Sequence, residues 1–247
     1  MLKLTQFPLC PLSRSIRLAL ADLDLPFEMA EEHAWKWRPA FLALNPAGDL
    51  PVLEAGGRSV ICGAYAISEY LAEASWVETC ADPEKAARGI VLFPGDPEQR
   101  AEVRRLVDWF HLKFDREVSR DLLIEKVYPR VLSSRADDES GDSMSLPPPP
   151  DPQVQRAIRA NLKYHLSYIG FLSDQRRWLA GDAPSFADLA AAAHVSVADF
   201  LGEIAWEQHP SAKAWYQRIK SRPSFRPLLA DRLPGFQPPS HYADLDF

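Results

Sequence analysis

The chain has 247 residues, of which 47% are hydrophobic and 25% charged, values typical of a globular protein with one large domain or two small ones. Its 28 Lys and Arg against 34 Asp and Glu give a formal charge of -6, and no basic run marks a site for phosphate backbones. These figures exclude nucleic acid as an expected partner.

The N-terminal third alternates strand and helix patterns. Strands are expected at residues 2–7, 26–29, 50–53 and 59–62, and helices at residues 13–23, 37–44 and 66–74. The order β-α-β-α-β-β-α predicts an α/β domain over residues 1–77, with a small mixed sheet and helices on both faces.

Residues 78–97 contain several Pro and Gly residues and are predicted to be a linker. The rest, residues 98–233, is predicted to be all-helical. Apolar residues recur at helical spacing in two long helices, at about 98–132 and 154–172. Ser185 and Asp188 form a capping box that begins a buried helix over 186–201. A last helix is expected at 212–222, and Pro223 and Pro227 are expected to end regular structure.

Two acidic, Pro-rich segments account for the whole charge imbalance. Residues 134–152 carry a net charge of -4, and the tail, residues 234–247, carries -2. The first is predicted to be a mobile insertion in the helical domain, because such a composition cannot pack into a core.

The three cysteines have no metal-ligand spacing, so neither a disulfide framework nor a metal site is expected, and a reducing cytoplasm fits this usage. The first residues lack the basic and apolar regions of a signal peptide. The apolar stretch 186–201 is interrupted by Asp188, His194 and Asp199, so no membrane insertion is expected. His194 itself is interpreted as a core histidine with hydrogen-bond partners.

Several motifs together resemble the cytosolic glutathione S-transferase superfamily over residues 2–232. They include Phe-Pro-Leu-Cys-Pro-Leu-Ser-Arg at 7–14, the stretches 43–53 and 66–71, and the capping box. The resemblance implies a thioredoxin-like N-terminal domain, an all-helical C-terminal domain and a cis peptide bond before Pro51.

In this family the residue that faces the glutathione thiol lies at the start of the first helix, where Cys10 and Ser13 are found. Unpaired amides and the helix dipole favour a thiolate there. Cys10 has the chemistry to form a mixed disulfide with glutathione. The alternative is a small turn residue without a catalytic role.

Glutathione would also meet Leu50, Pro51, Gly63 and Ala64. Transferases have an acid followed by Ser where this chain has Gly63 and Ala64, and those side chains grip the γ-glutamyl end. Each lost charged hydrogen bond removes roughly 1 to 3 kcal/mol, or about tenfold to a hundredfold in affinity. We therefore expect weak or absent glutathione binding and no cofactor.

Residues 221–232 and 238–247 resemble a subgroup of transferase-like bacterial division proteins that bind the tubulin homologue FtsZ, as do residues 31–38 and 114–126. This resemblance implies a non-catalytic homodimer in the cytoplasm, at the division site. Such a protein binds FtsZ filaments, promotes their curvature and supports constriction. The alternative is a glutathione-dependent transferase or thiol-disulfide reductase that uses Cys10 or Ser13.

Three groups of residues are candidates for partner binding. The first group is a cluster of aromatic and basic residues in a loop, and it is equally well explained as core packing or cleft lining. The second is a charged helix face, and it is equally well explained as ion pairs in solvent. The groups are Trp35, Trp37 and Arg38; Asp115, Arg116, Arg120 and Asp121; and, in the tail, Tyr242, Asp244, Leu245, Asp246 and Phe247.

The tail group combines three large apolar side chains with two acids. It packs either on its own body or on a partner. Read as a docking segment, residues 240–247 are expected to be dispensable for stability, so deleting them should abolish partner binding and leave the melting temperature nearly unchanged.

Overall fold

The N-terminal domain is built on a four-stranded mixed sheet with the order β2-β1-β3-β4. The strands are β1 (Leu2–Gln6), β2 (Phe27–Glu31), β3 (Val52–Ala55) and β4 (Ser59–Cys62). β1 is parallel to β2 and antiparallel to β3, which pairs antiparallel with β4. The structure is a computed structural model and describes residues 1–56, 59–81, 90–132 and 149–246.

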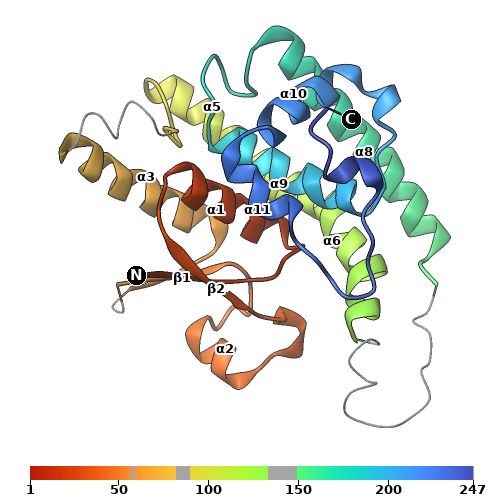
Figure 1. The fold of residues 1–247 in the computed structure, drawn as a ribbon, viewed down its shortest axis with the longest axis horizontal. Helices are drawn as coiled ribbons and strands as arrows, with labels where there is room; N and C mark the ends of the chain where they lie inside the picture. The colour runs from red at the N-terminus through yellow and green to blue at the C-terminus, as the bar shows by residue number, and fades with distance from the viewer. Residues whose placement is uncertain (57–58, 82–89, 133–148, 247) are drawn as a thin grey trace.

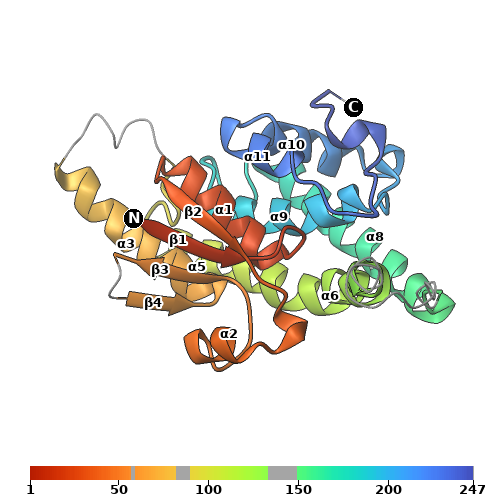
Figure 2. The ribbon, with the colours of Figure 1, turned by 60° about the horizontal axis from the view of Figure 1, so that its bottom comes forward.

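Two helices, α1 (Pro11–Asp22) and α3 (Ala64–Ala81), cover one face of this sheet, and α2 (Pro39–Leu44) lies on the other (Figure 2). The predicted order of elements is thereby confirmed. α3 continues past the predicted boundary at residue 77, and the peptide bond between Leu50 and Pro51 is cis, as the family resemblance implied.

The remaining elements are helical. Residues 97–132 form one long helix, in which α5 (Pro97–Asp108) leads into a π-helical stretch (Trp109–Ser119), α6 (Arg120–Leu122) and a second π-helical stretch (Leu123–Val127). Its apolar face is buried as predicted, but the spacing of apolar residues gave no sign of the π-helical turns. The other helices are α8 (Pro152–Gln175), α9 (Phe186–Phe200), α10 (Pro210–Lys220) and α11 (Arg226–Leu229).

α9 forms the centre of the helical domain (Figure 1), and every residue in it is buried. The predicted capping box is present: the Ser185 amide donates to the Asp188 carboxylate at 3.1 Å. Asp188 also accepts from the Leu179 amide and from the Trp215 indole, at 2.9 and 3.0 Å. Because α9 packs against α1, the buried helix also joins the two domains.

His194 on α9 is a core histidine, as predicted, and belongs to a chain of buried hydrogen bonds. The Ser15 hydroxyl donates to the Leu12 carbonyl at 2.8 Å, so it accepts from Nε2 of His111 at 3.2 Å. Nδ1 of His111 then accepts from Nε2 of His194 at 3.1 Å, and Nδ1 of His194 accepts from the Ser119 hydroxyl at 2.7 Å. One proton arrangement of two neutral imidazoles therefore satisfies the whole chain.

The expectation that Pro223 and Pro227 end regular structure is wrong. Pro223–Phe225 is a 3₁₀ turn and α11 follows it, with Pro227 in its first turn. Proline is favoured at such positions because the first amides of a helix have no intrahelical partner.

Parts of the predicted linker and insertion lie outside the described residues, namely 82–89 and 134–148. The described ends of both segments are ordered by caps. Asp96 and Gln99 cap α5 reciprocally, and the Asp151 carboxylate accepts from the Gln153 amide at the start of α8.

Candidate functional site

Cys10 lies at the N-cap of α1 and is partly buried. We use the name cleft for the domain boundary that Cys10 and Trp35 form with Asp115 and Tyr128 of the long helix. Burial raises the pKa of its thiol, and the negative charge of Asp115 acts in the same direction. The Ser13 hydroxyl and the amides of Ser13 and Leu12 oppose this shift without reversing it. The thiol is therefore protonated at neutral pH and is a poor nucleophile in this state.

The other expected glutathione contacts lie close to one another on the same side of the cleft. The Gly63 amide donates to the carbonyl of Pro51 at 2.9 Å, so this amide is already used. Gly63 has a φ of +87° and Ala64 is 2% exposed, and neither offers a side-chain donor or acceptor. Ser13 is fully buried and does not present its hydroxyl to the cleft.

Trp35 lines the cleft within an aromatic cluster that joins the two domains. Its ring lies 4.2 Å from that of Tyr128 and 5.0 Å from that of Phe7, measured between centroids, and His33 is at 4.7 Å. These contacts agree with the reading of Trp35 as core packing or cleft lining. Sequence reasoning missed Tyr128, because nothing in its neighbourhood indicates which aromatic residue it meets across the cleft.

Trp37 is different, because 62% of its surface is exposed and its φ is +47°. A bulky residue in the left-handed region is strained, by about 1–2 kcal/mol. Its neighbour Arg38 pairs with the buried carboxylate of Glu32, and this hydrogen bond lowers the pKa of Glu32. The ion pair fixes the loop that carries the exposed indole.

The charged residues singled out on the long helix lie on two different sides of it. Burial raises the pKa of Asp115 to about 6, while Arg120 lowers it and Asp121 raises it. Asp115 also raises the pKa of both Cys10 and Tyr128, which places it on the cleft side.

Arg116 does not join this group. Its guanidinium is 70% exposed and lies 3.8 Å from Glu117, on the side of the helix that faces His165 of α8. The structure thus brings together three of the four charged residues singled out on this helix.

The tail packs on its own body through Tyr242, which is fully buried. The Tyr242 hydroxyl accepts from Arg14 at 3.2 Å and donates to the Leu228 carbonyl at 3.3 Å. Arg14 also donates to Ser196 and to Asp231, which binds Arg17 bidentately at 2.7 and 2.8 Å. This result settles the alternative left open for Tyr242 and argues against a dispensable tail.

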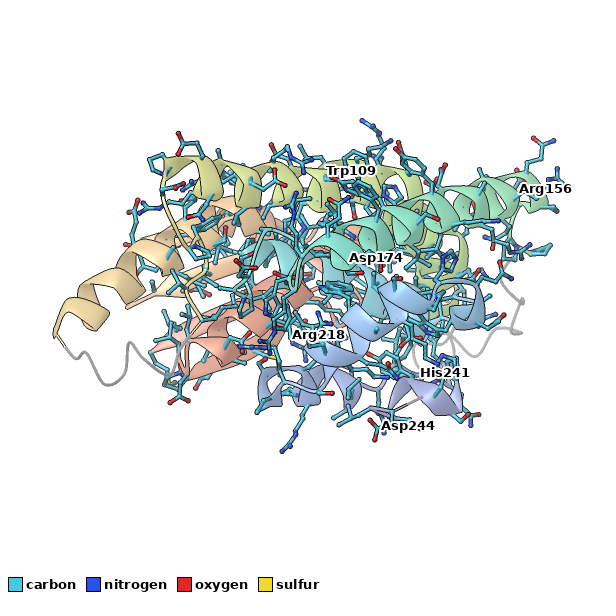
Figure 3. All side chains as sticks on the ribbon, turned by 90° about the horizontal axis from the view of Figure 1, so that it is seen from above. Trp109, Arg156, Asp174, Arg218, His241 and Asp244 are labelled. Carbon is cyan, nitrogen blue, oxygen red and sulfur yellow. The ribbon has the colours of Figure 1, made fainter. Side chains whose placement is uncertain are left out.

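A second set of bonds holds the turn at Ser240–Tyr242 (Figure 3 labels His241). His241 contacts the buried Asp199 carboxylate at 3.0 Å, and the buried Lys220 ammonium donates to the carbonyls of His241 and Asp244 at 3.0 and 2.6 Å. Burial lowers the pKa of Lys220 to about 8. The side chains of Asp244 and Asp246 are exposed and Leu245 is partly buried, whereas Phe247 lies outside the described residues.

Two features are missing from the residues that the structure describes. Among these residues there is no helix long and apolar enough to cross a membrane. Within the same ranges, no three His, Cys, Asp or Glu side chains come together as metal ligands would.

Comparison with known families agrees with this fold. Residues 4–75 match the model of the glutathione S-transferase N-terminal domain, and residues 133–223 match that of the C-terminal domain. The chain therefore belongs to the glutathione S-transferase superfamily.

Individual relatives resemble the chain over its whole length. FtsZ-localized protein A of Caulobacter vibrioides is 44% identical, with 99% of this chain and 97% of that protein covered. The solved structure of FzlA from C. crescentus superposes with a TM-score of 0.85 at 42% identity, covering 100% and 99% of the two chains. A glutathione S-transferase structure from Rhodospirillum rubrum gives a TM-score of 0.86 at 44% identity, covering both chains fully.

Proposed function

We propose that this chain is a transferase-like division protein that binds FtsZ filaments, promotes their curvature and supports constriction. The observation that carries the proposal is the 44% identity to FtsZ-localized protein A over nearly the full length of both chains, the tail included. The chain acts in the cytoplasm, at the division site.

The cleft supports a role without catalysis. A transferase must hold the glutathione carboxylate and stabilise a thiolate. Here Gly63 and Ala64 supply no side chain for the first task, and the raised pKa of Cys10 opposes the second. The fold keeps the cis-Pro51 turn that the family resemblance implied.

The surface proposed for FtsZ is the rim of the cleft. Trp37 offers a large exposed aromatic group on a loop fixed by Arg38 and Glu32, and rigid aromatic anchors of this kind dominate binding energy at interfaces. Across the cleft, Asp115 and Arg120 supply charges of both signs.

We further propose that the protein acts as a homodimer. A twofold dimer presents two copies of the same surface, so both can attach to one filament or to neighbouring filaments. Two fixed attachment points at a set angle favour a bent filament over a straight one.

Co-sedimentation with GTP-polymerised FtsZ tests the proposal. The protein should pellet only with polymers. The Trp37→Ala variant should bind the polymers with an affinity at least about tenfold lower, so less of it should pellet. Phe171→Ala is a matched control, because Phe171 is 56% exposed on a distant helix, and it should pellet like the wild type. Equal pelleting without FtsZ would contradict the proposal.

A glutathione-dependent enzyme is the second candidate. Cys10 favours it, since this thiol lies at a helix N-terminus in a cleft beside a cis-Pro51 turn. Isothermal titration distinguishes the two functions: micromolar glutathione affinity together with robust conjugation or disulfide reduction would reverse the ranking. We expect neither.

A further inference from the structure

The exposed side of the first half of α8 carries an unbalanced row of cations. Arg156, Arg159 and Lys163 are exposed, and none of them forms an ion pair with another residue that the structure describes. We call these three residues the basic face. On the neighbouring long helix, by contrast, Lys113 is paired with Glu117 and Lys126 with Glu203.

The arrangement of the basic face does not help the helix. Steps of three and four residues place the three cations on one side, where like charges destabilise a helix by about 0.2–0.5 kcal/mol per pair. Asp174, near the far end, is the single acid in α8, which spans 24 residues. No acid on the same helix therefore offsets this repulsion.

The charge of Lys163 also acts at the start of α10. α10 packs against α8, and His209 immediately precedes it. Burial lowers the pKa of His209 and Lys163 lowers it further, whereas Glu207 acts in the opposite direction. Lys163 is therefore close to the start of α10, and Glu207 acts on the same histidine with the opposite sign.

The size of the basic face limits what it can bind. Arg156 and Lys163 are seven residues apart, about 10 Å along the helix axis. That length matches about three residues of an extended chain. Figure 3 shows Arg156 at the outer end of α8, and Ala157 and Ala160 between the cations are exposed, which leaves room for a backbone to approach.

We propose that the basic face docks an extended acidic segment of a partner protein. A protein with a net charge of -6 is repelled by large anionic surfaces such as bilayers and nucleic acids. A short acidic peptide experiences mainly the local cations, because screening limits the field to about 8 Å at physiological salt. This docking site is separate from the cleft rim and does not depend on FtsZ.

The test is a fluorescence anisotropy titration with a labelled peptide of alternating Glu and Ser. The double variant Arg156→Glu, Lys163→Glu should bind at least about tenfold more weakly than the wild type, and added salt should weaken wild-type binding. The control variant Arg177→Glu, Arg226→Glu changes the net charge by the same amount at exposed positions outside the basic face, and should stay within about twofold.

Circular dichroism melting of both variants checks that they fold. Equal loss of peptide binding in both would overturn the proposal, since net charge alone would then explain it. Binding of phosphatidylserine vesicles through the basic face, without peptide binding, would overturn it in favour of a membrane surface. FtsZ co-sedimentation of the basic-face variant should be unchanged, so failure of this proposal and failure of the FtsZ proposal are distinguishable.

Discussion

The N-cap of α1 and the two turns that follow it use polar chemistry in opposite ways. At the N-cap, burial raises the pKa of Cys10, and the expected contact residues Gly63 and Ala64 offer no side-chain donor or acceptor. One turn further on, Arg14 and Arg17 are buried and fully engaged with the chain's own C-terminal residues. The comparison teaches that the buried hydrogen bonds of Arg14 and Arg17 attach the C-terminal residues to the first helix.

Truncation of residues 240–247 is the test of this comparison with the largest expected effect. It removes the buried ring of Tyr242 and the carbonyl partners of Lys220, so the free energy of unfolding should fall by about 3–5 kcal/mol in urea titrations. Asp244→Ala with Asp246→Ala keeps the backbone bonds and should cost less than about 0.5 kcal/mol. An unchanged midpoint after truncation would restore the view of a dispensable docking tail.

Acidification tests the buried histidines that pack around the long helix. Burial lowers the pKa of His111 and of His165 from 6.5 to about 4. Between these values the unfolded chain binds protons that the folded chain does not, so stability should fall with falling pH, by about 1.4 kcal/mol per pH unit for each histidine.

Asp115 opposes this fall, because its pKa is raised from 3.8 to about 6 and the folded state takes up its proton first. Asp115→Asn should therefore steepen the loss of stability between those two pH values. Urea unfolding at several pH values, with Asp246→Asn at an exposed position as control, measures both slopes. Parallel curves for wild type and Asp115→Asn would contradict the burial of this carboxyl.

The substitution Ala64→Ser tests whether a missing side chain limits glutathione binding in the cleft. A hydroxyl at the start of α3 restores one of the two missing side-chain groups, and glutathione affinity should rise by about tenfold in isothermal titration. Ala66→Ser, at an exposed position of the same helix, should have no effect. No gain from Ala64→Ser would mean that the cleft has lost more than this hydroxyl. Gly63 is left unchanged, since its φ of +87° strains any other residue.

Tyr242→Phe is the mildest test. It removes only the hydroxyl that links Arg14 to the Leu228 carbonyl, so the free energy of unfolding should fall by about 1 kcal/mol. Tyr164→Phe, at a residue that is 54% exposed, should leave stability unchanged. Equal values for the two variants would show that the Arg14 bond adds nothing beyond the buried ring.

Much of the fold was predictable because it depends on local patterns. Apolar spacing located the strands and long helices, Ser185 and Asp188 marked the start of α9, and the motif around Pro51 indicated its cis bond. The prediction from Pro223 and Pro227 was wrong, because proline ends a helix at one position but is favoured in the first turn of the next helix.

The site was less predictable, because its contacts join residues far apart in sequence. The Arg14 partners Asp231 and Tyr242 have no local signal, and Tyr128 meets Trp35 only after the two domains pack. The sequence did indicate that Tyr242 is an apolar anchor, but a pattern of apolar residues does not say whether the chain itself or another protein supplies the pocket.

The bonds of Arg14 also bear on the order in which the protein is made. Its partners Asp231 and Tyr242 are 217 and 228 residues further along the chain, so they leave the ribosome long after Arg14 does. Until then, the first domain carries two guanidinium groups at positions that become buried, without the carboxylate that neutralises them. The burial of these two guanidinium groups therefore needs residues that are synthesised long after the first helix, and a chain that stops before residue 231 lacks the carboxylate that pairs with them.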